Sequence, residues 1–389
     1  MKILITSEFY QPSIGGAQEV VKQIGEHLAA NGHQVIVATS HSDARPNTIN
    51  GVRIEAFKIS GNYVMGYKGE VERYSKFLLS EKFDVILNYA AQVWPTDIAL
   101  PLLKRIKAKK VLVPCGFSAL NRPEYQNYYK NMKSWLKKYD ATIYLSENYR
   151  DINFARASGV SNIHLIPNGA DEREFKKINR GRFREKFHIA QDTKIILSVG
   201  SHTGLKGHSE AIQIFTRSNI NNSVLVIIGN DFGTGCLRNC VAASKRIKLN
   251  PLQVLKRKKI IIADLNRQDT LNAYADSTLF LFPSNIEASP LVLFESMASG
   301  LPYLASDVGN TKEITSWSGG GKILPTQIRN DYSYADIIKS ATILEDLINN
   351  PAERERLGSS GRKAWADKFT WQKISVQYEQ LFEDLLIKH

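Results

Sequence analysis

Two carboxylates, Glu287 and Glu295, lie in the stretch of the sequence that is richest in residues able to do chemistry. This stretch runs from Pro283 to Pro302 and follows a short apolar run, 279–282, that predicts a buried β-strand. Ligands of open α/β sheets bind beyond the carboxyl ends of the strands. The segment is therefore a candidate binding site at the edge of a sheet.

A helix is expected to begin within this segment. Serine is a favoured N-cap and proline is tolerated in the first turn, so Ser289 and Pro290 predict its start. The backbone amides of Leu291, Val292 and Leu293 would then be free to bind an anion such as phosphate, helped by the helix dipole.

The two carboxylates would reach such a ligand from different heights. Glu287 lies on the loop before the expected helix, whereas Glu295 lies in its second turn. One can then reach a sugar and the other a ribose. Taken on composition alone, the segment also fits a loop and a buried helix with incidental acids.

Lys206 is a second candidate, in a glycine-rich loop at 200–207 that follows an expected strand. A lone lysine is usually a solvated surface charge, and only this position makes Lys206 a candidate phosphate ligand. A P-loop ATPase needs serine or threonine directly after the lysine, but Gly207 follows here. The pair Gly15 and Gly16 likewise lacks the third glycine of a dinucleotide fingerprint, which disfavours a hydride-transferring enzyme.

Parallel sheets are needed to position these residues, and the sequence predicts two of them. Strands at 3–6 and 35–39 flank a helix at 17–30, which is a βαβ unit. Further strands of the first half are expected at 52–57, 85–88, 111–114, 141–145 and 163–166. Turn residues at 166–171 predict a domain boundary. The alternation then restarts with strands at 195–199, 224–228, 260–262, 279–282 and 303–306. The predicted fold class is α/β, with two doubly wound domains in tandem.

The composition favours a protein with an anionic partner. The formal net charge is +13 and the pI is near 9.4, which leaves a nucleotide diphosphate, an anionic lipid and nucleic acid all open. The sequence has neither an apolar run of about 20 residues nor a secretory signal. We therefore expect a cytoplasmic protein, at most peripheral on the inner face of the membrane.

The cysteine pattern predicts no metal site. Cys236 and Cys240 are separated by three residues, where a zinc knuckle typically has two, and no second pair occurs. Isolated thiols in a reducing compartment are the expected state.

The stretch that contains Glu287 and Glu295 resembles the Glu-x7-Glu signature of glycosyltransferase family 4. As in that family, it continues with Glu-Ser-Met-Ala-Ser-Gly-Leu-Pro and then Ala-Ser-Asp-Val-Gly. The resemblance covers almost the whole chain, including Gly15-Gly16, Gly32-His33, Ile166-Pro167-Asn168-Gly169, Lys206-Gly207 and Tyr274-Ala275-Asp276. It implies the GT-B fold, two Rossmann-like domains that face an interdomain cleft. Residues 1–168 would bind the acceptor, residues 169–370 would bind the nucleotide-sugar donor, and a C-terminal helix at 371–389 would pack back on the first domain.

The resemblance also implies roles for individual residues. Glu287, which would contact the donor sugar, and Lys206 would be catalytic, and Glu295 would bind the ribose. The residues expected to bind the donor are Gly15, Gly16, Ser201, Lys206, Ser289, Pro290, Leu291, Val292, Leu293 and Glu295. Hydrogen-bond donors and a fixed cation would stabilise the charge that builds on the departing diphosphate.

Retention of anomeric configuration without a metal or other cofactor is implied by the same resemblance. The leaving phosphate would help to deprotonate the acceptor in a front-face displacement. In agreement, the sequence contains no Asp-x-Asp triplet that could anchor a divalent cation to the diphosphate.

Two positions depart from the family pattern. Ser201 stands where many relatives carry an arginine, and Cys115 stands before Gly116 where many carry a histidine. A thiol with a reference pKa near 8.5 is mostly neutral at pH 7 and cannot replace an imidazole. Cys115 and Gly116 remain the expected acceptor-binding residues, with that contact either dispensable or altered.

Two basic surfaces are expected. Five residues share one face of a predicted helix: Tyr128, Met132, Trp135, Leu136 and Tyr139. The basic residues near them lie largely off that face or upstream: Lys104, Arg105, Lys107, Lys109, Lys110, Lys130, Lys133, Lys137 and Lys138. This helix can rest on an anionic membrane or simply pack on its own sheet.

A second basic cluster is expected to be solvated, and because it lacks interleaved aromatics it does not predict nucleic-acid binding. Its members are Lys245, Arg246, Lys248, Lys256, Arg257, Lys258 and Lys259.

The sequence thus predicts a retaining hexosyltransferase that moves a sugar from a nucleotide diphosphate, with UDP the expected nucleotide. The acceptor would be a glycan or a lipid-linked glycan in polysaccharide or glycoconjugate biosynthesis. Two alternatives stay open, a nucleotide-sugar epimerase or hydrolase of the same fold and a basic binding protein without catalysis.

Overall fold

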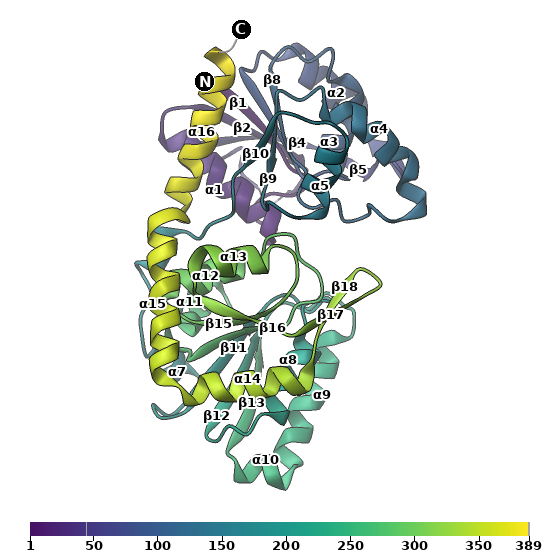
Figure 1. The fold of residues 1–389 in the computed structure, drawn as a ribbon. Helices are drawn as coiled ribbons and strands as arrows, with labels where there is room; N and C mark the ends of the chain where they lie inside the picture. Colours follow the sequence, from purple (N-terminus) through teal and green to yellow (C-terminus); the bar gives the residue numbers. More distant parts are fainter. Residues whose placement is uncertain (44, 388–389) are drawn as a thin grey trace. The chain divides into compact units, whose positions relative to one another are not determined.

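The computed structural model describes residues 1–43 and 45–387 (Figure 1). The chain divides into two compact units. The first unit comprises Met1–Asn168 and the chain from Trp371 onward, and the second comprises Gly169–Thr370. Each unit is a parallel sheet with helices packed on it, so the predicted class of two Rossmann-like α/β domains is confirmed.

The first unit contains an eight-stranded sheet in the order β10-β9-β8-β7-β1-β2-β4-β3. Its strands are β1 (Lys2–Thr6), β2 (Gln34–Ser40), β3 (Thr48–Ile49), β4 (Val52–Phe57), β7 (Val85–Tyr89), β8 (Lys109–Val113), β9 (Ala141–Tyr144) and β10 (Ile163–Leu165). All neighbours run parallel except β3, which is antiparallel to β4. A separate ribbon pairs β5 (Ile59–Asn62) with β6 (Gly66–Gly69). The short strands β3, β5 and β6 were not predicted, because they lack a buried apolar run.

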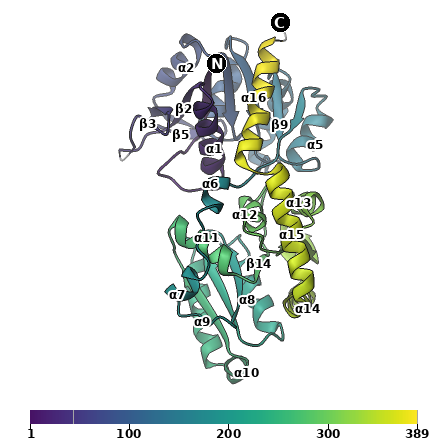
Figure 2. The same ribbon diagram turned by 90° about the vertical axis from the view of Figure 1, so that its left-hand side faces the viewer.

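The helices of this unit are α1 (Gly16–Ala30), α2 (Val71–Ser80), α3 (Trp94–Ala99), α4 (Gln126–Leu136), α5 (Arg150–Ala157) and α16 (Trp371–Ile387), with 3-10 turns at Leu100–Leu102 and Pro123–Tyr125. The helix α16 packs beside α1 (Figure 2). Its Glu379 carboxylate lies 2.6 Å from His33 Nε2 and accepts a hydrogen bond from Asn31 Nδ2 at 2.7 Å. Residues 388 and 389 of the expected C-terminal helix lie outside the described residues.

The second unit is a six-stranded parallel sheet in the order β13-β12-β11-β14-β15-β16. Its strands are β11 (Lys194–Val199), β12 (Ser223–Ile228), β13 (Lys258–Ala263), β14 (Leu279–Phe282), β15 (Tyr303–Ser306) and β16 (Gly321–Leu324), and an unpredicted hairpin adds β17 (Thr326–Arg329) and β18 (Tyr332–Ala335). The helices are α6 (Glu172–Phe175), α7 (Arg182–Lys186), α8 (His208–Arg217), α9 (Cys236–Leu249), α10 (Pro251–Leu255), α11 (Arg267–Asp276), α12 (Leu291–Ser299), α13 (Thr311–Ser318), α14 (Ile337–Asn349) and α15 (Pro351–Lys368).

Both faces of the second sheet are covered, as its continuous apolar strands require. Alternate residues of β11 point to opposite faces. Ile195 and Leu197 pack in a core with α11, α12 and α15, whereas Ile196 packs in a second core with α8, α9 and α14. Burial on both faces holds the strand ends in place, and the loops that carry the candidate site residues begin at those ends.

The structure favours packing over membrane contact for the aromatic face of the first basic surface and corrects one residue of the second. The aromatic face of α4 is buried in the core of its own unit, with Tyr128 and Met132 almost fully enclosed, so this face is not available to a membrane. In the second cluster Lys258 is buried, not solvated. Its ammonium donates to the carbonyl oxygens of Phe215 and Ser218, and burial lowers its pKa to about 8.

None of the helices in the described part of the chain combines the length and the apolar composition needed to span a lipid bilayer.

Candidate active site

The strand order of the second unit reverses between β11 and β14. The chain winds outward from β11 through β12 to β13 and then returns to β14 on the other side of β11, so this pair marks a topological switch point. The loops after two such strands diverge and leave a crevice for a ligand at the carboxyl edge. The loop after β11 carries Lys206, and the loop after β14 carries Glu287.

These two side chains meet directly. Lys206 Nζ lies 2.7 Å from Glu287 Oε1 and donates a hydrogen bond to it. Glu287 Oε1 also accepts from the hydroxyl of Ser284 at 2.9 Å. The lysine side chain is 29% exposed and the glutamate side chain 12% exposed, so the pair is held at the edge of the protein, reachable from solvent. An ammonium offers three donors, and the other two remain available for a ligand oxygen.

The lysine loop is fixed to the loop after β14 by its backbone. The Leu205 carbonyl accepts from the Asn285 amide at 3.0 Å and from the Ser284 hydroxyl at 3.3 Å. Gly207 adopts φ +69°, and a Cβ at this position would lie 1.9 Å from the Pro283 carbonyl oxygen. Only glycine permits this close approach, which places the Lys206 backbone against the strand end.

The helix α12 starts one residue later than predicted. Pro290, not Ser289, is the N-cap, and no side chain caps the helix. The Ser289 hydroxyl instead accepts a hydrogen bond from Asn310 Nδ2 at 3.2 Å. The prediction that the amides of Leu291 to Leu293 are all free is wrong for Leu293, whose amide donates to the Pro290 carbonyl at 3.2 Å.

The free amides of this helix are therefore those of Leu291 and Val292. Proline has no side-chain acceptor to offer them, and no hydrogen bond from either amide is found in the described structure. Uncapped amides at the positive end of a helix are suited to an anion.

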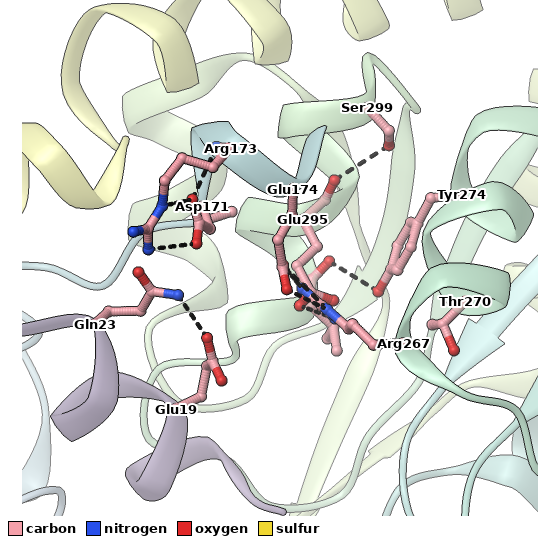
Figure 3. Close-up of polar contacts among 12 residues, drawn as sticks. Glu19, Gln23, Asp171, Arg173, Glu174, Arg267, Thr270, Tyr274, Glu295 and Ser299 are labelled. Carbon is pink, nitrogen blue, oxygen red and sulfur yellow. Dashed lines mark hydrogen bonds and ion pairs between the residues drawn. The ribbon is translucent and has the colours of Figure 1, made fainter. Parts of the chain in front are cut away.

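Glu295 is oriented by a cation that the sequence did not single out. Arg267 Nη1 lies 2.6 Å from Glu295 Oε1, and Arg267 Nη2 lies 2.6 Å from Glu174 Oε2 (Figure 3). Glu295 is mostly buried, and its Oε2 atom has no hydrogen-bond partner in the described structure. An ionised oxygen buried without a donor is costly, so a ligand hydroxyl at this place would be favourable.

Sequence reasoning missed Arg267 because its partners are distant in the chain. Asn266 caps α11 and precedes Arg267, so the local sequence indicates only a helix start. The ion pairs to Glu174 and Glu295 exist only after α6, α11 and α12 pack together.

Ser201, where many relatives were expected to carry arginine, makes no ionic contact. Its hydroxyl donates to Asn230 Oδ1 at 2.7 Å on the exposed side of the loop. The positive charge of this loop therefore comes from Lys206 and not from the residue after Gly200.

The remaining predicted residues belong to the first unit. Gly15 is the N-cap of α1 and Gly16 its first residue, and α1 has no side-chain cap. Cys115 and Gly116 follow β8 at the carboxyl edge of that sheet. The Gly116 amide donates to Asp151 Oδ2 at 2.9 Å. Burial, with a smaller effect of Asp151, raises the pKa of the Cys115 thiol to about 11, so the thiol is protonated at neutral pH.

A group of metal-ligand side chains lies close to the lysine loop. His202 and His208 flank Lys206 in sequence, and a ring nitrogen of each lies within 4.8 Å of the sulfur atoms of Cys236 and Cys240 in α9. Of these four residues, the sequence singled out only the two cysteines, which are free thiols as expected. The histidines gave no signal beside them, because they precede the cysteines by about 30 residues.

Comparisons with known proteins identify the family of the chain. A family model described as glycosyl transferases group 1 matches residues 179–364, and one described as glycosyltransferase family 4 matches residues 14–174. The N-acetyl-alpha-D-glucosaminyl L-malate synthase of Bacillus anthracis is 23% identical over 99% of this chain and 98% of its own length. An Escherichia coli UDP-Gal:alpha-D-GlcNAc-diphosphoundecaprenol alpha-1,3-galactosyltransferase is 24% identical over 79% of this chain and 80% of its own length.

Among solved structures, Anabaena HepE in complex with UDP superposes with a TM-score of 0.76 at 14% identity, covering 99% of this chain and 100% of its own. This likeness confirms the fold. Because the two family models together span most of both units, the chain belongs to the group 1 glycosyltransferases of family 4 and is a transferase enzyme.

Proposed function

We propose that the second unit binds a nucleotide diphosphate sugar at the carboxyl ends of β11 and β14. The observation that carries this proposal is the 2.7 Å pair of Lys206 and Glu287 next to the uncapped start of α12. Lys206 and the amides of Leu291 and Val292 supply positive charge and donors to the diphosphate. Glu287 binds sugar hydroxyls, and Glu295 accepts from the ribose through its unpartnered Oε2 atom.

The reaction that follows is transfer with retention. The bond from the anomeric carbon to the diphosphate oxygen breaks, and its electron pair stays with the diphosphate. The acceptor hydroxyl oxygen bonds to the anomeric carbon on the same face, and its proton passes to the departing phosphate. Lys206 stabilises the charge that develops on the diphosphate, so that no divalent cation is needed there.

UDP is the proposed nucleotide and a glycan or lipid-linked glycan the proposed acceptor. The galactosyltransferase relative carries UDP-Gal and a diphosphoundecaprenol-linked sugar in its name, and the HepE structure contains UDP. We assign the acceptor to the first unit, with Cys115 and Gly116 at its sheet edge. Contact with an anionic membrane surface would use the exposed lysines of α4, such as Lys130 and Lys133, and not its buried aromatic face.

Incubation of the purified chain with UDP-, GDP- and ADP-sugars and a set of glycan acceptors tests this function. We expect transfer from one donor, an α-linked product from an α-linked donor by proton NMR, and no increase in rate when Mg²⁺ or Mn²⁺ is added. An epimerised or hydrolysed donor without a transferred sugar would support the epimerase or hydrolase alternative. Failure to bind any nucleotide sugar would contradict the proposal.

A further inference from the structure

Four side chains with soft and borderline donor atoms converge in the second unit: His202, His208, Cys236 and Cys240. One ligand atom of each lies within 4.8 Å of all the others. His202, His208 and Cys240 are buried, and Cys236 is partly exposed. Neither the family nor the proposed reaction gives these side chains a role.

Separate elements of the fold hold the four residues in place. His202 is fixed by backbone contacts, since its amide donates to the Asn230 carbonyl at 2.8 Å and its carbonyl accepts from the Thr234 hydroxyl at 2.8 Å. His208 is the first residue of α8. Cys236 is the first residue of α9, and Cys240 follows one turn later on the same face, as the helical spacing requires.

Three of the separations match those of a tetrahedral metal site, and the ligand atom of Cys240 lies within 4.8 Å of the other three. Zinc bonds of about 2.0–2.1 Å to nitrogen and about 2.3 Å to sulfur place tetrahedral ligands about 3.3 Å apart for two nitrogens and about 3.6 Å apart for nitrogen and sulfur. In the structure, the Nδ1 atoms of His202 and His208 lie 3.2 Å apart. Cys236 Sγ lies 3.4 Å from His202 Nδ1 and 3.7 Å from His208 Nδ1.

Hydrogen bonding alone leaves this cluster poorly satisfied. Two imidazole nitrogens face each other, and the Nε2 atoms of both histidines are buried with no hydrogen-bond partner in the described structure. A pair of buried imidazoles next to two thiols is unusual in a protein core, because buried polar groups without hydrogen-bond partners destabilise the fold. A bound cation would use the converging lone pairs.

We propose that His202, His208, Cys236 and Cys240 bind one Zn²⁺ ion. Two sulfur and two nitrogen donors favour zinc over magnesium or calcium, which prefer oxygen. Four protein ligands leave no open position, so the ion is structural and does not act on the donor. Binding converts both thiols to thiolates and releases their two protons to solvent.

The ion would position the lysine loop. His202 and His208 bracket Lys206, so that coordination of both fixes the two ends of the segment from which Lys206 reaches Glu287. The linkage of this segment to α9 would then depend on the metal. This inference concerns the metal and does not rest on the proposed transfer reaction.

Metal content measured on the intact chain tests the proposal directly. The protein, reduced and equilibrated with Zn²⁺ and then freed of excess metal, should retain one zinc per chain. Co²⁺ substitution should give the visible bands of a tetrahedral ion and a sulfur-to-cobalt charge-transfer band. Absence of bound metal from the reduced wild-type chain, or a cobalt spectrum without the sulfur band, would overturn the proposal.

Variants identify the ligands. The double variant Cys236→Ser with Cys240→Ser, and His208→Ala, should lose stoichiometric zinc. Two matched controls, Cys115→Ser in the first unit and the exposed His188→Asn, should keep one zinc per chain. Full retention of zinc by the double cysteine variant would place the ion elsewhere and refute the assignment. The cobalt spectrum of the wild-type chain requires no substitution, so it remains decisive even if a variant fails to fold.

A thermal measurement examines the structural role. Removal of zinc with a strong chelator should lower the melting temperature of the wild-type chain, and added Zn²⁺ should restore it. The double cysteine variant should show no such response. A melting temperature of the wild-type chain that does not change with zinc would contradict a structural ion.

Discussion

The loops at the carboxyl edges of the two sheets differ in the charged side chains that they carry. In the second unit, the edge holds the Lys206–Glu287 pair and the Arg267 pairs with Glu174 and Glu295. In the first unit, the corresponding loop after β8 presents the Cys115 thiol, which burial keeps protonated. Two Rossmann-like sheets of similar design thus carry different chemistry. A diphosphate is stabilised by fixed cations such as Lys206, and this contrast supports the proposed donor site in the second unit.

The largest expected effect comes from removal of the lysine. Lys206→Ala should lower kcat by about 10²–10³-fold, because one fixed donor to the developing charge is lost, a change of about 2.7–4 kcal/mol in the barrier. Steady-state kinetics with the donor identified in the screen measures it. Lys322→Ala, which removes another lysine paired with a glutamate in the same unit, is the control and should keep wild-type kcat. Equal kcat values for the two variants would show that the charge of Lys206 does not contribute to the reaction.

Packing beneath the lysine loop gives the second prediction. Gly207→Ala combines a positive φ with a contact of 1.9 Å to the Pro283 carbonyl and should lower the free energy of unfolding by about 2–4 kcal/mol. Gly233→Ala has a similar φ, +71°, and no atom within 4 Å of its Cβ, so it should cost only about 1 kcal/mol. Urea unfolding followed by circular dichroism compares them. Identical urea midpoints for the two variants would show that the lysine loop can shift to accommodate the added Cβ at little cost.

The carboxylate on α12 has a smaller, more specific role. Glu295→Gln removes the charge that pairs with Arg267 and that we propose binds the ribose, and it should raise KM for the donor about tenfold, or about 1.4 kcal/mol. The change in kcat should be smaller, since the ribose is remote from the bond that breaks. Initial rates at varied donor concentration separate the two constants. A large fall in kcat with unchanged KM would move Glu295 into the catalytic step.

The first unit provides the smallest prediction, through the pKa of its thiol. Burial raises the pKa of Cys115 to about 11 in the folded state, above the reference value near 8.5. At pH 8 the thiolate fraction is then about 200-fold lower than in the unfolded chain, and alkylation of Cys115 should be slower by at least that factor. Mass spectrometry of iodoacetamide-treated native and urea-unfolded protein checks this. Equal labelling rates would show that the thiol is exposed and ionised.

The same shift fixes the sign of a pH effect on stability. The folded state binds the Cys115 proton more tightly than the unfolded state does. The protonated thiol therefore makes its full contribution to the free energy of unfolding below about pH 8.5, and this contribution is lost as the pH rises through about 11. Cys115→Ser should therefore flatten the fall in melting temperature over this range.

Most of the fold could be predicted, because continuous apolar runs such as 279–282 and 224–228 need little context to form buried strands. The exact start of α12 could not, since Pro290 serves as N-cap or as first helical residue depending on the neighbouring loop. The motifs singled out Lys206 and Glu287, and the structure shows that these two side chains contact each other. Arg267 and the histidines of the metal cluster were missed, because their partners come together only when separate helices pack.

Hydrogen–deuterium exchange with and without the nucleoside diphosphate tests most directly where the donor binds. UDP, GDP and ADP are screened first, and the one that binds is used. We expect slower exchange in peptides that cover 200–208 and 284–295, because the ligand would bind the lysine loop and the start of α12. Protection confined to other segments, with these two unchanged, would contradict the assignment of the donor site.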